Sequence, residues 1–193
     1  MFIDIFQQLN FLDILILIIL FRICYIAIKT GLAIEFFKLS GVIFAIYIAS
    51  HYYISIADII RERYLHQVIP LEFADFLVFC LLALLAYLFF VLLRITFYRF
   101  MKMEAAPNLN KYGGLILGLA RGYFSVGLLV YLLMISSVSY LNDSVKHSYL
   151  GTRFSSVSAQ TYNWIWDSVF SKFFPQEKSN VVVNEVRDNF TKK

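Results

Sequence analysis

Four stretches of this chain are long and apolar enough to cross a lipid bilayer, and they constrain its fold more than any other feature. They cover about residues 11–28, 33–57, 76–93 and 113–141. A helix needs roughly 20 apolar residues to span a bilayer, and the only other spanning structure is a closed barrel of alternating apolar and polar strands. The third stretch, FLVFCLLALLAYLFFVLL, does not alternate. We therefore expect an all-α fold, an integral membrane bundle of four transmembrane helices.

The composition agrees with this class. The chain is 60% hydrophobic and only 16% charged, whereas a soluble domain is about half apolar and a quarter charged. The net charge of +4 needs no nucleic acid or other acidic partner, because basic residues usually mark the cytoplasmic ends of membrane helices. The partner that the composition predicts is the lipid bilayer.

The basic residues around the spans predict an orientation. The second connection has only Arg61 and Arg63, and the N-terminus has no basic residue. The first and third connections are flanked by more of them: Lys29, Lys38, Arg94, Arg99, Lys102 and Lys111. Because cytoplasmic loops carry an excess of lysine and arginine, we expect these two connections in the cytoplasm and both termini on the periplasmic side.

The chain divides into a four-span membrane domain, residues 1–141, and an extramembrane tail, residues 142–193. Within the tail, TYNWIWDSVFSKFFP places apolar residues at helical spacing, which predicts an amphipathic helix near residues 160–174. This helix either lies at the membrane interface or packs on the outer face of the protein or on a neighbouring subunit. The polar sequence beyond Pro175 predicts a flexible C-terminal tail.

The sequence contains none of the common catalytic or nucleotide-binding motifs: H-E-x-x-H, G-x-S-x-G and the P-loop are all missing. Cys24 and Cys80 have no cysteine or histidine at metal-ligand spacing. His51, in ASHYY, is interpreted as part of an interfacial aromatic belt, and His66 and His147 lie in connecting segments without a motif. We therefore expect that the protein is not an enzyme and uses no metal or cofactor.

Five charged residues lie within or at the edge of the spans: Asp13, Arg22, Glu35, Lys38 and Arg121. Such residues cost about 2.5–3.5 kcal/mol at the centre of a span and usually face other helices. For Arg22 and Lys38 the favoured interpretation is a side chain that reaches back to the headgroups. Asp13 and Glu35 are too short for this, so they should have a polar partner or lie at the membrane boundary.

Arg121 and Glu35 lie at depths in their helices that differ by about the length that an arginine side chain can span. Arg121 is eight residues beyond Gly113 and Glu35 is four beyond Gly31, or about 12 Å and about 6 Å along two helices that start at the same face. An arginine side chain reaches back toward that face. We therefore hypothesise that Arg121 pairs with Glu35. Asp13 is the weaker candidate because it lies near the opposite face, and the alternative is an arginine without a protein partner.

Gly114, Gly118 and Gly122 recur every four residues in the fourth span. This spacing clears one helix face of side chains, so that another backbone can approach closely. We expect close packing, within the subunit or against another copy or another inner-membrane protein; the alternative is a glycine-lined pore. Gly127 lies outside this register and should tolerate a larger side chain better.

With these residues identified, the chain resembles the colicin V production protein (CvpA) family, small four-span inner-membrane proteins of bacteria. The likeness covers roughly residues 11–140 and excludes the tail. It rests on the acidic start of the first span, on KTGLAIE and on NKYGGLILGLARG. The candidate residues in these motifs are Asp13, Gly31, Glu35, Lys111, Gly114, Gly118, Arg121 and Gly122. Asn110 is a departure, since the family usually has an aspartate there.

The resemblance implies a protein of the bacterial inner membrane with a role in colicin V production or export, envelope homeostasis and biofilm formation. It supplies no catalytic site. Together with the residues, it favours a protein that acts through helix packing with itself or with partner proteins. The rival is a channel or small-solute transporter in which Asp13, Glu35 and Arg121 line a path.

Overall fold

The computed structural model describes residues 10–64, 71–100 and 107–191, and all regular structure among them is helical. His66 lies outside these ranges. The long helices are α2 (Phe11–Thr30), α3 (Leu32–Tyr64), α4 (Leu71–Phe100) and α5 (Pro107–Met134). The tail contains α6 (Ser139–His147), α7 (Tyr149–Phe154), α8 (Val157–Ile165), the π-helical η1 (Trp166–Phe170), α9 (Ser171–Phe173) and α10 (Val182–Thr191). The four long helices are each apolar enough to span a membrane, as predicted.

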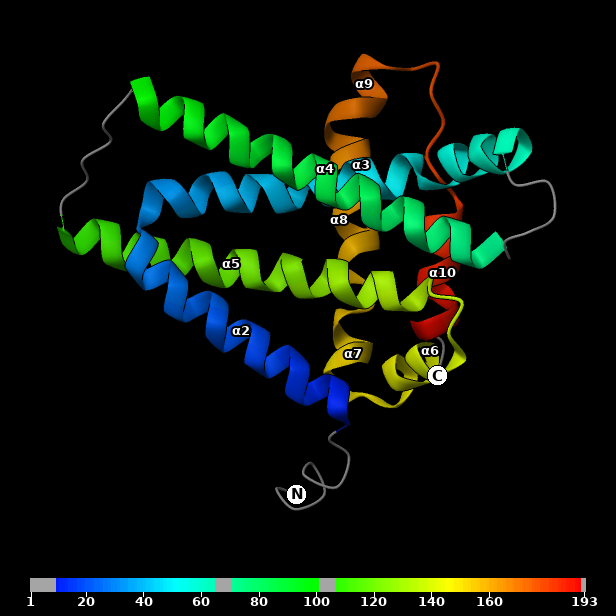
Figure 1. Cartoon of the computed structure of the whole chain (residues 1–193), viewed down its shortest axis with the longest axis horizontal. Coiled ribbons are helices and arrows are strands. Elements are labelled where there is room, and N and C mark those ends of the chain that lie inside the picture. Colours follow the sequence, from blue (N-terminus) through cyan, green and yellow to red (C-terminus); the bar gives the residue numbers. More distant parts are fainter. Residues whose placement is uncertain (1–9, 65–70, 101–106, 192–193) are drawn as a thin grey trace.

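The four spans lie side by side in the order α4, α3, α5, α2 (Figure 1). Helix α3 packs against both α4 and α5, and α5 packs against α2. Helices α2 and α4 form the two edges of this row, and they bury a smaller share of their side chains than α3 and α5 do. The edge helices therefore present the larger apolar surfaces to the bilayer.

Local hydrogen bonds define where the first and fourth spans begin and end. Asn10 caps α2 through a reciprocal capping box with Asp13, and Gly31 ends it with a positive φ of 82° that favours glycine. Helix α5 ends at Met134 and not near residue 141 as expected. The Ser136 hydroxyl accepts from the Val138 backbone N–H, and the Ser136 carbonyl accepts from the Asn142 amide. These local bonds compete with helix continuation.

The tail crosses the row of spans, with α7, α8, η1 and α9 following one another over α5 and α3 (Figure 1). The predicted amphipathic helix is thus present as α8–α9. Its apolar side chains Tyr162, Ile165 and Trp166 are buried in one cluster with Tyr47 and Tyr53 of α3. Of the alternatives considered above, packing on the outer face of the same chain therefore accounts for the buried face of this helix.

The prediction of a flexible tail beyond Pro175 is wrong, because this segment returns to the spans. The Asn180 side chain donates to the Ser50 carbonyl at 2.7 Å. Helix α10 follows and buries Val183 in the cluster that contains Tyr162. Contacts with residues far away in the sequence thus hold this polar segment in place, although its local sequence gives no sign of them.

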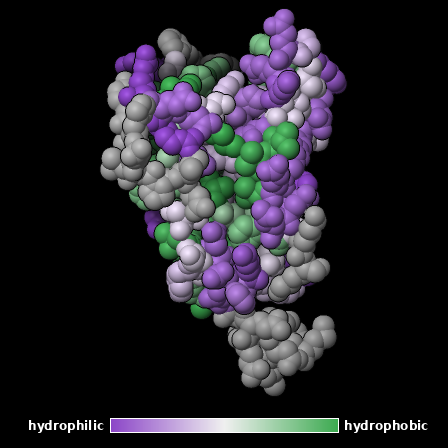
Figure 2. Space-filling model, turned by 90° about the vertical axis from the view of Figure 1, so that its right-hand side faces the viewer, coloured by the Kyte–Doolittle hydropathy of each residue, from purple (hydrophilic) through white to green (hydrophobic). Residues whose placement is uncertain are grey.

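The molecule has two distinct ends. At one, which we call the turn end, the Gly31 turn lies against Asn110 at the start of α5. At the other, the tail end, α6 and α10 lie beside the last turns of α5 (Figure 1). Figure 2 shows the tail end, where hydrophilic residues surround a smaller hydrophobic area. This distribution fits a surface that lies outside the hydrocarbon core.

Candidate functional site

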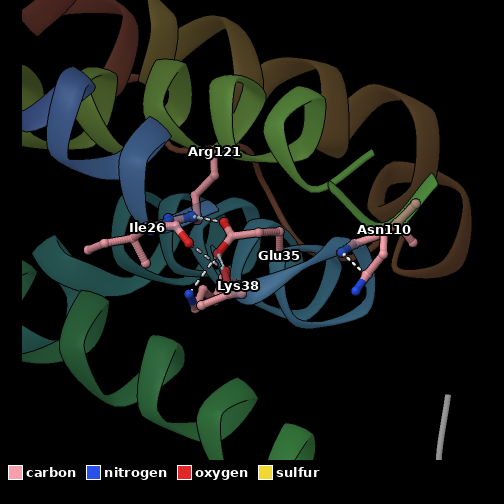
Figure 3. Close-up of polar contacts among 7 residues, drawn as sticks. Ile26, Glu35, Lys38, Asn110 and Arg121 are labelled. Atoms are coloured by element: carbon pink, nitrogen blue, oxygen red, sulfur yellow. Dashed lines mark hydrogen bonds and ion pairs between the residues drawn. The ribbon is translucent and has the colours of Figure 1, made fainter. Parts of the chain in front are cut away.

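Glu35 is the centre of a buried charge cluster near the turn end (Figure 3). Arg121 Nε donates to Glu35 Oε2 at 2.7 Å, which confirms the predicted pair. Lys38 Nζ donates to Glu35 Oε1 at 2.7 Å, and the Thr30 hydroxyl donates to the same oxygen at 2.6 Å. We call Thr30, Glu35, Lys38 and Arg121 the charge cluster. One carboxylate thus binds groups from three helices.

The turn between α2 and α3 places these groups together. Thr30 is the last residue of α2 and Glu35 lies in the first turn of α3, so the Gly31 turn brings them within hydrogen-bond distance. Lys38 follows Glu35 by three residues, a spacing that puts both on one helix face. The favoured interpretation of Lys38 as a side chain reaching the headgroups is therefore wrong, and the part played by Thr30 was not anticipated.

The charge cluster contains two cations and one anion. Glu35 is completely buried, and the side chain of Arg121 is only 11% exposed. Arg121 Nη2 is buried and has no hydrogen-bond partner in the described part of the chain. Both carboxylate oxygens of Glu35 already accept hydrogen bonds from donors of the chain itself. The arrangement joins helices and holds a net positive charge.

The glycine face of α5 packs against α2 of the same chain. A Cβ atom at Gly118 would lie 2.2 Å from the Cβ of Ala27, and one at Gly114 would lie 2.9 Å from the Ala27 carbonyl oxygen. At Gly122 the nearest atom is the end of the Leu20 side chain, at 3.0 Å. The stripe is therefore a close helix–helix contact within the subunit. It neither lines a pore nor remains free for another copy.

Gly127 does not behave as the sequence predicted. A Cβ atom there would lie 2.5 Å from the Val157 Cγ1 atom in the first turn of α8. Val157 is itself buried. Gly127 is therefore a second close-approach position, where the tail crosses α5, and a larger side chain there would displace the tail.

Asn110 caps the start of α3, although it lacks the negative charge of the aspartate that is usual in the family. Its Oδ1 atom accepts from the Leu32 backbone N–H at 2.8 Å, at the start of α3 (Figure 3). An amide oxygen caps a helix as a carboxylate does. A Cβ atom at Gly31 would lie 2.3 Å from the same oxygen, which explains a glycine at this turn. Lys111 is exposed beside Asn110 and takes no part in the charge cluster.

Asp13 lies toward the tail end and is not a partner of Arg121. Its carboxylate is completely buried. It accepts from the Ser148 hydroxyl and the Leu150 backbone N–H, both at 2.7 Å, and from the Asn10 backbone N–H at 2.8 Å. The polar partner expected for Asp13 is thus the start of α7. Asp13 and the charge cluster are separate sites, joined to different parts of the chain.

His51 lies in a polar–aromatic junction that the sequence analysis missed. Its Nδ1 atom is 3.0 Å from the Tyr162 hydroxyl, which accepts from the Asn180 backbone N–H at 2.7 Å. Its ring stacks on Trp166, with centroids 5.2 Å apart, and Nε2 is 3.5 Å from Glu177. Burial raises the pKa of the Tyr162 hydroxyl above its ordinary value.

An open pocket of about 410 Å³ lies beside this junction and is lined by His51, Tyr52, Glu177 and Lys178 among others. The pocket forms where the ASHYY segment meets residues 177–182 of the tail, which lie more than 120 residues later in the sequence. No local spacing in the sequence could have indicated such a contact.

A family model described as "Colicin V production protein" matches residues 12–176 of the chain. The match continues past residue 140, where the resemblance was expected to end, and includes α6 to α9. Searches of curated proteins and of solved structures found no match. The segment that the family model covers therefore includes the tail helices that pack on the spans.

Proposed function

Because the chain belongs to the colicin V production protein family, we propose that it acts in the bacterial inner membrane in colicin V production or export and in envelope homeostasis, without catalysing a reaction. The observation that supports a non-catalytic role is how the acidic groups of the spans are used. Glu35 and Asp13 are both completely buried, and both bind donors of the chain itself. Their role in the described structure is to hold helices together.

A protein of this kind acts through contacts with other proteins. The row of spans leaves α2 and α4 as edges whose outward faces are covered by no other described element of the chain. Helix association in lipid depends on packing and on interhelical polar contacts. The edges are the surfaces on which partner helices would bind.

The observations speak against a channel or transporter. The glycine face is filled by α2, and Asp13 and Glu35 lie toward opposite ends of the spans. A path lined by Asp13, Glu35 and Arg121 would have to cross the apolar contact between α2 and α5, which contains Ile16 and Val126.

Complementation tests the proposal. A strain that carries colicin V genes but lacks its own family member should secrete active toxin again when it expresses this chain. The Glu35→Gln variant should fail, and Asn108→Ala, an exposed change on α5, should succeed. If the wild-type chain accumulates in the inner membrane without restoring secretion, the toxin role is wrong. Solute flux in proteoliposomes that is abolished by Glu35→Gln would support the transporter instead.

A further inference from the structure

Arg22 has no partner within the part of the chain that the structure describes. It is exposed, and no described carboxylate lies within ion-pair distance of it. The two cations of the charge cluster, by contrast, share Glu35. Arg22 is thus a span arginine whose charge no described carboxylate of the chain neutralises.

The depth of Arg22 makes this arrangement costly in lipid. It is the twelfth of the 20 residues of α2, so it lies about 12 Å from the Thr30 end and about 17 Å from the Phe11 end. The hydrocarbon core is about 30 Å thick, which places Arg22 close to its middle. An extended arginine side chain covers only about half of the distance to the nearer interface.

Arg22 lies at the centre of the outward face of α2. Ile18, Phe21 and Tyr25 flank it at helical spacing and are 59%, 75% and 62% exposed. Lys29 lies on the same face, seven residues closer to the turn end, where it contacts the Tyr25 hydroxyl at 2.5 Å. Lys29 is thus the cation of this face that reaches the turn end. Arg22, two turns deeper, does not.

We infer that the outward face of α2 binds a transmembrane helix of another protein that carries an aspartate or glutamate near its middle. Charge complementarity identifies the partner, because an anion at the same depth stabilises a cation in hydrocarbon. This inference names the chemistry of the partner that the proposed function requires. Its test measures physical contact with the partner and not toxin secretion. The inference and the proposed function can therefore fail independently.

A second copy of the chain does not supply that anion. Three described carboxylates of the spans, those of Asp58, Glu62 and Asp75, lie near span ends and not at the middle depth of Arg22. The other two, Asp13 and Glu35, are completely buried and bonded within their own chain. A parallel copy would therefore place no accessible described carboxylate at the depth of Arg22. The partner is therefore a different protein.

Photo-crosslinking in intact membranes tests this inference with the full chain. The photo-crosslinker p-benzoylphenylalanine replaces Phe21 beside Arg22, or Phe89 as the control, which is 53% exposed on the other edge helix, α4. We expect an adduct with a second protein from position 21 and not from position 89. Arg22→Gln should lower its yield roughly tenfold, and Arg22→Lys should retain most of it.

Two further results would support the inference. The crosslinked segment should be a transmembrane helix with an acidic residue. Neutralising that residue should reduce the yield of the adduct as Arg22→Gln does. Exchanging the two charges should then restore it. Because Arg22→Gln removes an exposed charge from lipid, it should accumulate at least as well as the wild type. The inference is wrong if position 21 gives no adduct, crosslinks to a second copy or only to lipid, or gives an adduct that Arg22→Gln leaves unchanged.

Discussion

Arg121 and Glu35, 86 residues apart in the sequence, form an ion pair of 2.7 Å that joins the middle of α5 to the first turn of α3. Lys38 shares the same carboxylate. Glu35 is thus the one anion between two cations, and the three side chains are not equivalent. Loss of Glu35 leaves two positive charges enclosed, whereas loss of Lys38 leaves a neutral pair.

We therefore expect Glu35→Gln to be far more damaging than Lys38→Met. Removing one partner of a buried pair costs about 3–5 kcal/mol, so Glu35→Gln should lower both accumulation in the membrane and the thermal unfolding midpoint in detergent. Lys38→Met should remain close to the wild type, because Arg121 and Thr30 still bind Glu35. Equal midpoints for the two variants would contradict this account of the charge cluster.

Charge exchange provides the control for this prediction. Arg121→Glu and Glu35→Arg should each lower accumulation, and the double exchange should recover part of it because the charge total of the cluster is restored. Recovery should be incomplete, since Lys38 is placed to bind a carboxylate at position 35 and not at position 121. A double variant no better than the worse single variant would show that the pair itself is not what stabilises the fold.

The contact between α5 and α2 should be sensitive to a single methyl group. Gly118→Ala would place a Cβ atom 2.2 Å from the Cβ of Ala27, and overpacking of this kind costs about 1–3 kcal/mol. The thermal midpoint should fall, and Ala27→Gly in the same chain should restore it. Gly122→Ala meets only the flexible end of Leu20 and should be milder. Absence of rescue by Ala27→Gly would mean that the two helices are not in direct contact here.

The features set by hydropathy and depth were predictable from the sequence. The four spans follow from long apolar runs, and the pair between Arg121 and Glu35 follows from counting residues from the two helix starts. The contact of Lys38 with Glu35 was equally predictable, because residues three apart share a helix face. The general tendency of lysine to reach the headgroups favoured the other interpretation.

The order of the tail could not be predicted, because its stabilising contacts join residues far apart. Asn180 binds the Ser50 carbonyl across 130 residues, and Leu150 binds Asp13 across 137. Such pairs leave no periodic signal in the sequence. The wrong expectation for Gly127 has the same origin, since Val157 of the tail fills the space beside it.

Asn110 should be replaceable by aspartate but not by alanine. Its side-chain oxygen caps the start of α3 through the Leu32 N–H, and loss of such a cap costs about 0.5–2 kcal/mol. Asn110→Asp keeps an acceptor and adds a negative charge at a helix N-terminus, which is favourable. In detergent, Asn110→Ala should lower the thermal midpoint and Asn110→Asp should not. The exposed Asn108→Ala is the matched control; if it lowers the midpoint as much, the cap is not responsible.

Asp13 should control whether the tail stays docked. All of its hydrogen-bonding neighbours are donors, namely Asn10, Ser148, Tyr149 and Leu150. Asp13→Asn would point an NH₂ group at some of them, and a buried unsatisfied group costs about 1–3 kcal/mol. Limited proteolysis should then cut the tail faster while the spans stay protected. In the control variant Asp143→Asn, which changes an exposed side chain, the protease should cut the tail at the wild-type rate. If Asp13→Asn also leaves the cutting rate unchanged, Asp13 does not anchor the tail.

The last prediction concerns orientation. The turn end carries Lys29 and Lys111, both exposed, and an excess of basic residues marks the cytoplasmic side. We therefore expect the turn end in the cytoplasm and the tail in the periplasm. In a chain with Cys24→Ala and Cys80→Ala, a membrane-impermeant thiol reagent added to intact cells should label Lys178→Cys in the tail and not Asn108→Cys. Both positions are exposed, so a difference in labelling reports the side of the membrane and not burial. Asn108→Cys should react only after the inner membrane is opened, and the reverse pattern would invert the whole topology.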